Sequence, residues 1–369
     1  MTLRETLTRM FRRNASQYLY VAIAADHVRG GQQDQDALVE GRDYFRLWLT
    51  EMSLKHDRDW FRTWHPAVHS LVHFQFGDEL VDVPNIVGEG GLKNIDSAHL
   101  ERNISLNHPL TTLMPFSGGV IEVTVALIAL QGQDYLKRFI KVLSDFAGLV
   151  AVPQLSTALT VAGPLATGIE ELLGGGDGEM HLGLHQAYVH KGGGDNELRP
   201  TYYAAIRATE AQIAPATLWV VDGRLRRGDS AEQSVPFGGY AYMLLRAQKE
   251  TVRDDWEGLA SFTWPFEAAI KEISLGHQDS ADFHYRAAMA AVLSSADLTQ
   301  ADRRRFAEVL RDRFSQARDL GLGAAPVWGP LAADVAAIPV EEALGQGEPE
   351  ITEFLPEART GWSPSGLGD

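Results

Sequence analysis

The hydrophobic pattern of this chain changes its period three times, and the order of these changes limits the folds that it can adopt. From residue 18 to residue 130, apolar residues alternate with polar ones or form short runs, as they do in β-strands. Residues 133–173 instead place apolar residues three and four positions apart, as on one side of a helix. Strand-like segments return from 180 to 247, and helical spacing follows up to residue 317. This order predicts an α+β fold: an antiparallel β-sandwich (or a barrel) with an inserted apolar helical hairpin and a C-terminal helical segment.

The same changes divide the 369-residue chain into four expected parts. They are a basic amphipathic N-terminal helix at 1–15, a β-sandwich domain at 16–250 with the hairpin inserted at about 133–173, a helical segment at 251–319 packed on that domain, and an acidic Gly/Pro-rich tail at 320–369. The tail holds eight carboxylates against one arginine and so contributes −7 to the formal net charge of −16. Because it lacks sustained periodicity, we expect an irregular tail that is pinned at Val327-Trp328 and Phe354-Leu355.

Composition excludes several classes of function. The chain has no cysteine, which rules out disulfides, thiol catalysis, thiolate zinc sites and iron–sulfur clusters. Its 49 acidic side chains outnumber its 33 basic ones, and this charge repels phosphate backbones, so we expect no nucleic-acid partner. The sequence contains no nucleophile elbow, phosphate-binding loop or dinucleotide fingerprint, and we expect no cofactor. The lack of cysteine and of a secretory signal fits the cytoplasm.

The N-terminal segment and the hairpin are the candidate contact surfaces. We expect the N-terminal helix to dock on the body of the protein, with an anionic membrane as the alternative surface. Residues 146–169 of the hairpin carry no charged side chain, and about twenty such residues cross a bilayer, but two prolines and several threonines make this segment too polar for a typical span. We therefore expect the hairpin to cover a sheet face or a subunit interface. Its predicted contact residues are Leu136, Phe139, Leu143, Phe146, Leu155 and Leu159.

Histidines gather in two of the predicted strands. His69 and His73 lie in one of them, and His181 and His185 lie in another. Residues four apart share one face of a strand but lie about 13 Å from each other, too far for one metal ion to bind both. A metal site would therefore combine histidines from two strands, and these four residues are its candidate ligands.

With no catalytic motif, the sequence favours a non-catalytic cytosolic interaction or assembly protein that acts through protein–protein contacts. A protein partner or self-association would cover its apolar surface. The first alternative is a latent pore-forming protein that inserts residues 134–173 into a membrane. The second is a metal-dependent hydrolase with histidine ligands.

Overall fold

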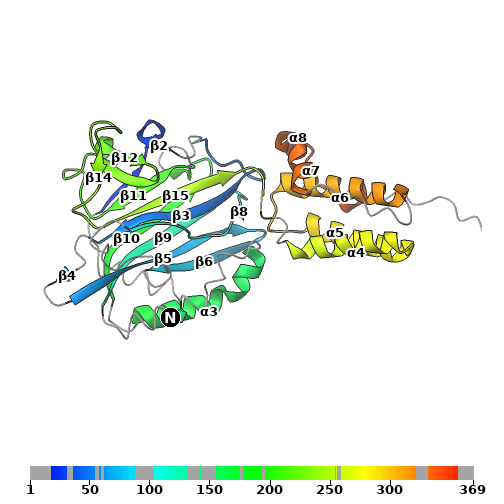
Figure 1. Cartoon of the computed structure of the whole chain (residues 1–369), viewed down its shortest axis with the longest axis horizontal. Helices are drawn as coiled ribbons and strands as arrows, with labels where there is room; N and C mark the ends of the chain where they lie inside the picture. The colour runs from blue at the N-terminus through cyan, green and yellow to red at the C-terminus, as the bar shows by residue number, and fades with distance from the viewer. Residues whose placement is uncertain are drawn as a thin grey trace, which may run out of the picture. The chain divides into compact units, whose positions relative to one another are not determined.

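The computed structural model divides the chain into two compact units, Met1–Thr251 and Val252–Asp369, which we call the sheet unit and the helical unit (Figure 1). It describes residues 18–30, 36–54, 58–59, 62–88, 104–131, 141–142, 155–174, 178–192, 196–253, 255, 259–320 and 331–355. The predicted N-terminal helix at 1–15 lies outside these residues.

The described strands of the sheet unit form three sheets, and their strand pairs are antiparallel except the one between β2 and β12. The six-stranded sheet has the order β1 (Leu19–Ala22), β11 (Tyr202–Ile206), β15 (Tyr242–Glu250), β3 (Tyr44–Ser53) and β7 (Ile104–Pro109), with β8 (Met114–Pro115) also paired to β3. The five-stranded sheet has the order β10 (Gly178–Val189), β9 (Val120–Gln131), β5 (Arg62–Phe76) and β4 (Arg58–Asp59), with β6 (Glu79–Gly88) also paired to β5. The four-stranded sheet has the order β14 (Val235–Pro236), β13 (Arg224–Arg227), β12 (Leu218–Val221) and β2 (Val28–Arg29). The described residues of this unit also include two short 3-10 helices, η1 (Ala25–His27) and η6 (Pro215–Thr217).

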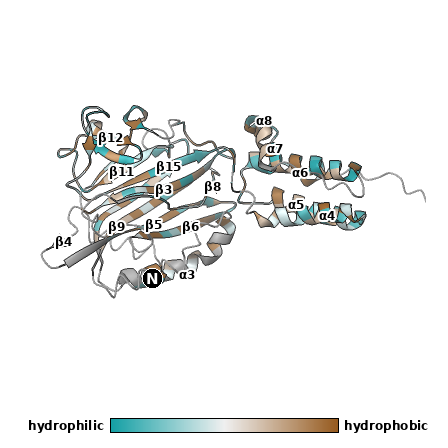
Figure 2. Cartoon of the chain, in the orientation of Figure 1, coloured by the Kyte–Doolittle hydropathy of each residue, from teal (hydrophilic) through white to brown (hydrophobic). Residues whose placement is uncertain are grey.

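The period-2 pattern explains how the six-stranded and five-stranded sheets pack. Along β5, Val68, Val72 and Phe74 are buried on one face, and Phe74 meets Phe45 of β3 edge to face, with 5.6 Å between the ring centroids. Figure 2 shows hydrophobic stretches along β5 and β9. This face-to-face core confirms the predicted α+β class with antiparallel sheets, and the sheets formed by the described strands are open, so they make no closed barrel.

Strand β11 of the six-stranded sheet is buried on both of its faces. All five residues of β11 are buried, with Tyr202, Ala204 and Ile206 in one apolar cluster with residues of the four-stranded sheet such as Leu218. A strand covered on two sides carries a continuous apolar run rather than an alternating one. In Figure 1 the four-stranded sheet, the six-stranded sheet, the five-stranded sheet and helix α3 (Leu155–Gly174) follow one another from top to bottom.

The helical unit is built on three long helices, α4 (Ala260–Ser274), α5 (Gln278–Leu293) and α6 (Gln300–Leu320). Their apolar faces form one core, in which Phe262, Tyr285, Phe306 and Phe314 are fully buried. The helical segment predicted at 251–319 thus consists of helices whose apolar stripes face one another.

The C-terminal tail, which the sequence predicts to be irregular, is partly helical where the structure describes it. Residues 331–355 form three short helices, α7 (Leu331–Ala337), α8 (Val340–Gly345) and α9 (Ile351–Phe354), which contact α6. Only three of their described side chains are buried apolar anchors: Val335, Ala343 and Phe354. These anchors lie eight and eleven residues apart, so they leave no periodic signal in the sequence, although Phe354 is one of the predicted pins.

Candidate functional site

Three of the four predicted metal ligands, His69, His73 and His185, share a sheet face, but each has a partner of its own. Since Phe74 points into the core, His69 and His73 lie on the outer face of the five-stranded sheet, and the strand register places His185 on that face too. The Nδ1 atom of His69 is 2.7 Å from the carbonyl oxygen of Asn85, that of His73 is 2.8 Å from Asp82 Oδ1, and that of His185 is 2.9 Å from Thr124 Oγ1. Within the described parts of the chain, no three His, Asp or Glu side chains lie close enough to hold a metal ion.

Two further observations concern the burial of His69 and the position of His181. His69 is completely buried, and this burial lowers the pKa of its imidazole to about 4, so the ring is neutral at pH 7. His181 lies where the register of β10 shifts between Met180 and Leu182, which separates it from the regular row that contains His185.

The hairpin predicted as a contact surface is described in its second arm. Helix α3 contacts β6, and Leu155 is completely buried while Leu159 is half-buried. Leu136, Phe139, Leu143 and Phe146 lie outside the described residues. None of the described helices is both long enough and apolar enough to cross a membrane.

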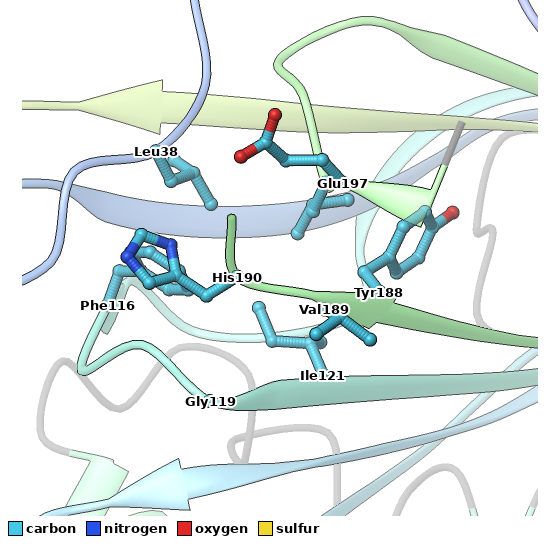
Figure 3. A pocket seen from close by; sticks show the side chains of 9 residues that line it. Leu38, Phe116, Gly119, Ile121, Tyr188, Val189, His190 and Glu197 are labelled. Atoms are coloured by element: carbon cyan, nitrogen blue, oxygen red, sulfur yellow. The ribbon is translucent and has the colours of Figure 1, made fainter. Parts of the chain in front are cut away.

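A small pocket lies where β9 begins and β10 ends (Figure 3). Its wall consists of Leu38, Phe116, Gly119, Ile121, Tyr188, Val189, His190, Glu197 and Leu198. The His190 ring meets Phe116 edge to face at 5.0 Å, and its Nε2 atom lies 3.6 Å from Glu40 Oε2. The cavity volume of about 10 Å³ is room for about one water molecule, so this pocket, in the described conformation, is too small for an organic substrate.

The outer face of the α4–α5 hairpin exposes two large aromatic side chains. Trp264 on α4 is 71% exposed, and Phe283 on α5 is 69% exposed. Each lies two residues after a buried residue of its helix, Phe262 and Ala281, and a step of two residues turns a helix by about 200°. Both side chains therefore point away from the core of the helical unit, on two consecutive helices that contact each other.

A second feature of this unit is the groove between α5 and α6 that holds Phe354. The Phe354 side chain is 1% exposed, and its carbonyl oxygen accepts a 2.6 Å hydrogen bond from the Tyr285 hydroxyl. The Tyr285 ring stacks on Phe314 with 4.1 Å between centroids. The guanidinium carbons of Arg304 and Arg311 lie 5.9 and 5.8 Å from the centroid of the Phe354 ring, within the range of cation–π attraction.

Ion pairs join the acidic C-terminal segment (331–355) to α6. Glu353 pairs with Arg304 at 2.7 Å, Glu348 lies 3.9 Å from Arg303, and Asp334 pairs with Arg313. The hydrogen bond from Arg304 is the main cause that lowers the pKa of the Glu353 carboxyl. The contrast between the six arginines of α6 and the carboxylates of the tail is visible in the sequence, and it is the signal that could have predicted this contact.

No family model matches this sequence, and neither the curated proteins nor the solved structures contain a significant match to the chain.

Proposed function

We propose that this chain is a non-catalytic, cytoplasmic assembly protein that associates with a second copy of itself through the outer face of the α4–α5 hairpin. The observation that carries the proposal is the exposure of Trp264 and Phe283 on two consecutive helices of the same unit. Aromatic residues are enriched in the cores of protein interfaces, whereas scattered exposed aliphatic residues are normal on a soluble surface. Closed two-fold dimers are the commonest oligomers, and in such a dimer this surface would meet its own copy.

Burial of the exposed aromatics accounts for only part of the free energy that a dimer needs. Each fully buried aromatic side chain contributes about 2 kcal/mol, so the four aromatics of a two-fold interface contribute about 8 kcal/mol before the cost of association. That gross value corresponds to a dissociation constant of about 1 μM. The cost of association lowers the net binding free energy and so raises the dissociation constant above this value. Polar contacts around the aromatics therefore have to contribute, and we expect a dimer that dissociates on dilution.

Two findings make the enzyme alternatives less attractive. Three of the four histidines that the sequence suggested as metal ligands are engaged with separate partners, Asn85, Asp82 and Thr124. The pocket beside His190 admits about one water molecule. The absence of cysteine supports a cytoplasmic location, because a chain without disulfides does not depend on an oxidising compartment.

Capture between two differently tagged full-length copies tests this proposal. With both copies co-expressed, we expect the second tag to be recovered with the first from the wild-type chain. The double variant W264A/F283A should lose at least about 90% of that recovery, as expected when interface hot spots are removed. The matched control is L80A, because Leu80 is 67% exposed but lies on β6 of the sheet unit. Equal recovery from the wild type, the double variant and the control would refute the proposal.

A further inference from the structure

The last described residues of the chain are held in the way a bound peptide is held. Of the residues from Gly345 to Leu355, Phe354 is the one that is buried, and the others are exposed or half-buried. A short segment with a single aromatic anchor and flanking charges is the usual form of a peptide that docks on a helical groove.

The anchor residue Phe354 is held through both its backbone and its ring. Tyr285 on α5 donates its hydroxyl proton to the main-chain carbonyl of Phe354 at 2.6 Å. Arg304 and Arg311, which are about two turns apart on α6, place their guanidinium groups within 6 Å of the ring. The groove therefore offers a hydrogen-bond donor for the peptide backbone and two cations for an aromatic side chain.

The same groove selects negative charge on the residues around the anchor. Arg304 donates a 2.7 Å hydrogen bond to Glu353 and a 3.1 Å hydrogen bond to the side-chain oxygen of Gln346. Arg303 lies 3.9 Å from Glu348. A partner with carboxylates before a phenylalanine would reproduce these contacts, and a basic or neutral peptide would not.

Residues 346–355 are held by few buried contacts, as expected of a segment that another peptide can displace. They add one buried apolar side chain to the unit, and their ion pairs involve carboxylates that are exposed, such as Glu353 at 43% and Glu348 at 70%. Exposed ion pairs are weak and are screened by salt. Release of these residues costs the burial of Phe354, the hydrogen bond from Tyr285 and the hydrogen bonds that Arg304 donates to Glu353 and Gln346, and it leaves α7 and α8 in contact with α6.

We propose that the groove between α5 and α6 is a docking site for an acidic peptide segment of a partner protein with a phenylalanine anchor, and that residues 346–355 of this chain occupy it until the partner displaces them. This site goes beyond the proposed dimer, because it lies on α5 and α6 and uses neither Trp264 nor Phe283. The occupant is defined by charge complementarity: its carboxylates pair with arginines of α6, and its aromatic ring lies within 6 Å of Arg304 and Arg311.

Fluorescence anisotropy with a labelled peptide that copies residues 346–357 tests the site in the full-length chain. The receptor is the F354A variant, whose own segment lacks the anchor. We expect the peptide to bind F354A about 30-fold more tightly than it binds the wild type, in which the groove is occupied, since an aromatic hot spot accounts for about 2 kcal/mol. The same peptide with alanine in place of its phenylalanine should bind F354A about 30-fold more weakly.

Two charge reversals in the F354A background localise the peptide. R304E should weaken peptide binding by at least about tenfold, because it replaces the contact to Glu353 by repulsion. R313E is the matched control, since Arg313 pairs with Asp334, which the peptide does not contain, and we expect no change in affinity. Circular dichroism of both variants verifies that the helices are retained. Equal affinity for F354A and the wild type, or equal binding of the peptide without phenylalanine, would overturn the proposal.

Discussion

The hydroxyl of Tyr285 donates a 2.6 Å hydrogen bond to the main-chain carbonyl of Phe354, 69 residues further along the chain. Burial raises the pKa of this hydroxyl above its usual value, so it stays protonated and remains a donor throughout the physiological range. Since the Tyr285 ring also stacks on Phe314, this one side chain connects α5, α6 and the C-terminal segment. The relationship explains how a segment without sustained hydrophobic periodicity is held in place.

Replacing Tyr285 by phenylalanine should loosen the C-terminal segment and leave the long helices in place. The Y285F variant keeps the ring stack on Phe314 but removes the hydrogen bond to Phe354, a loss of about 1 kcal/mol. We expect backbone amides in residues 351–355 to exchange about fivefold faster, because 1.4 kcal/mol corresponds to a factor of ten. S274A removes an exposed hydrogen bond to Lys271 and should leave these amides unchanged. Unaltered exchange in Y285F would contradict the role of this bond.

The attachment of the C-terminal segment should also weaken in acid. The pKa of Glu353 is lowered in the folded chain, first by the hydrogen bond from Arg304 and then by the backbone bond with Glu350. A group with a lowered folded pKa stabilises the fold above its unfolded pKa, about 4.3 for glutamate, and this contribution is lost as the pH falls through the folded pKa. Amide protection in residues 351–355, relative to α6, should therefore fall between pH 5 and pH 3. E353Q should show the lower protection already at pH 7 and respond less to acid; a response equal to that of the wild type would contradict this assignment.

Buried His69 predicts a second pH dependence, located in the sheet unit. Its folded pKa of about 4 lies below the unfolded value of 6.5, so the unfolded chain binds the proton first and stability decreases as the pH falls from 6.5 towards 4. Between pH 7 and pH 5 the wild type should lose about 2 kcal/mol of unfolding free energy through this residue. Hydrogen exchange of the β5 amides measures it. H69Q removes the titration and should flatten the slope by that amount, and identical slopes in both proteins would exclude His69 as the cause.

Alanine substitutions at Leu155 and Leu159 should differ in their effect on stability, because these two leucines of α3 differ in burial. Leu155 is completely buried, so L155A should destabilise the sheet unit by about 3 kcal/mol, the usual cost of a buried leucine-to-alanine change. Leu159 is half-buried, and L159A should cost less than half of that. Urea unfolding of the full-length variants measures both. Equal and small effects would mean that α3 contributes little to the core.

The periodic parts of this fold could be predicted from the sequence. The strands and long helices bury a regular face, and a face such as that of Val68, Val72 and Phe74 repeats within each element. The C-terminal helices could not be predicted in the same way, because Val335, Ala343 and Phe354 are too widely spaced to define a period.

The candidate sites were harder to predict, because they depend on which elements meet. The sequence places His69 and His73 on one strand face, and the structure agrees, but their partners Asn85 and Asp82 come from a neighbouring strand whose register no periodicity specifies. Trp264 and Phe283 lie within helical patterns whose apolar faces they do not share. Helical periodicity predicts that these two residues lie opposite the apolar face, but it does not predict that the opposite face stays exposed to solvent.

The central claim, assembly through the α4–α5 face, is tested most directly by the mass of the full-length chain in solution. Multi-angle light scattering after size exclusion, from about 1 to 100 μM protein, spans the range expected for a dissociation constant near or above 1 μM. We predict a mass that rises with concentration from 40.6 kDa for the single chain towards twice that value, and a constant single-chain mass for W264A/F283A. A wild-type mass of 40.6 kDa at every concentration would contradict the account.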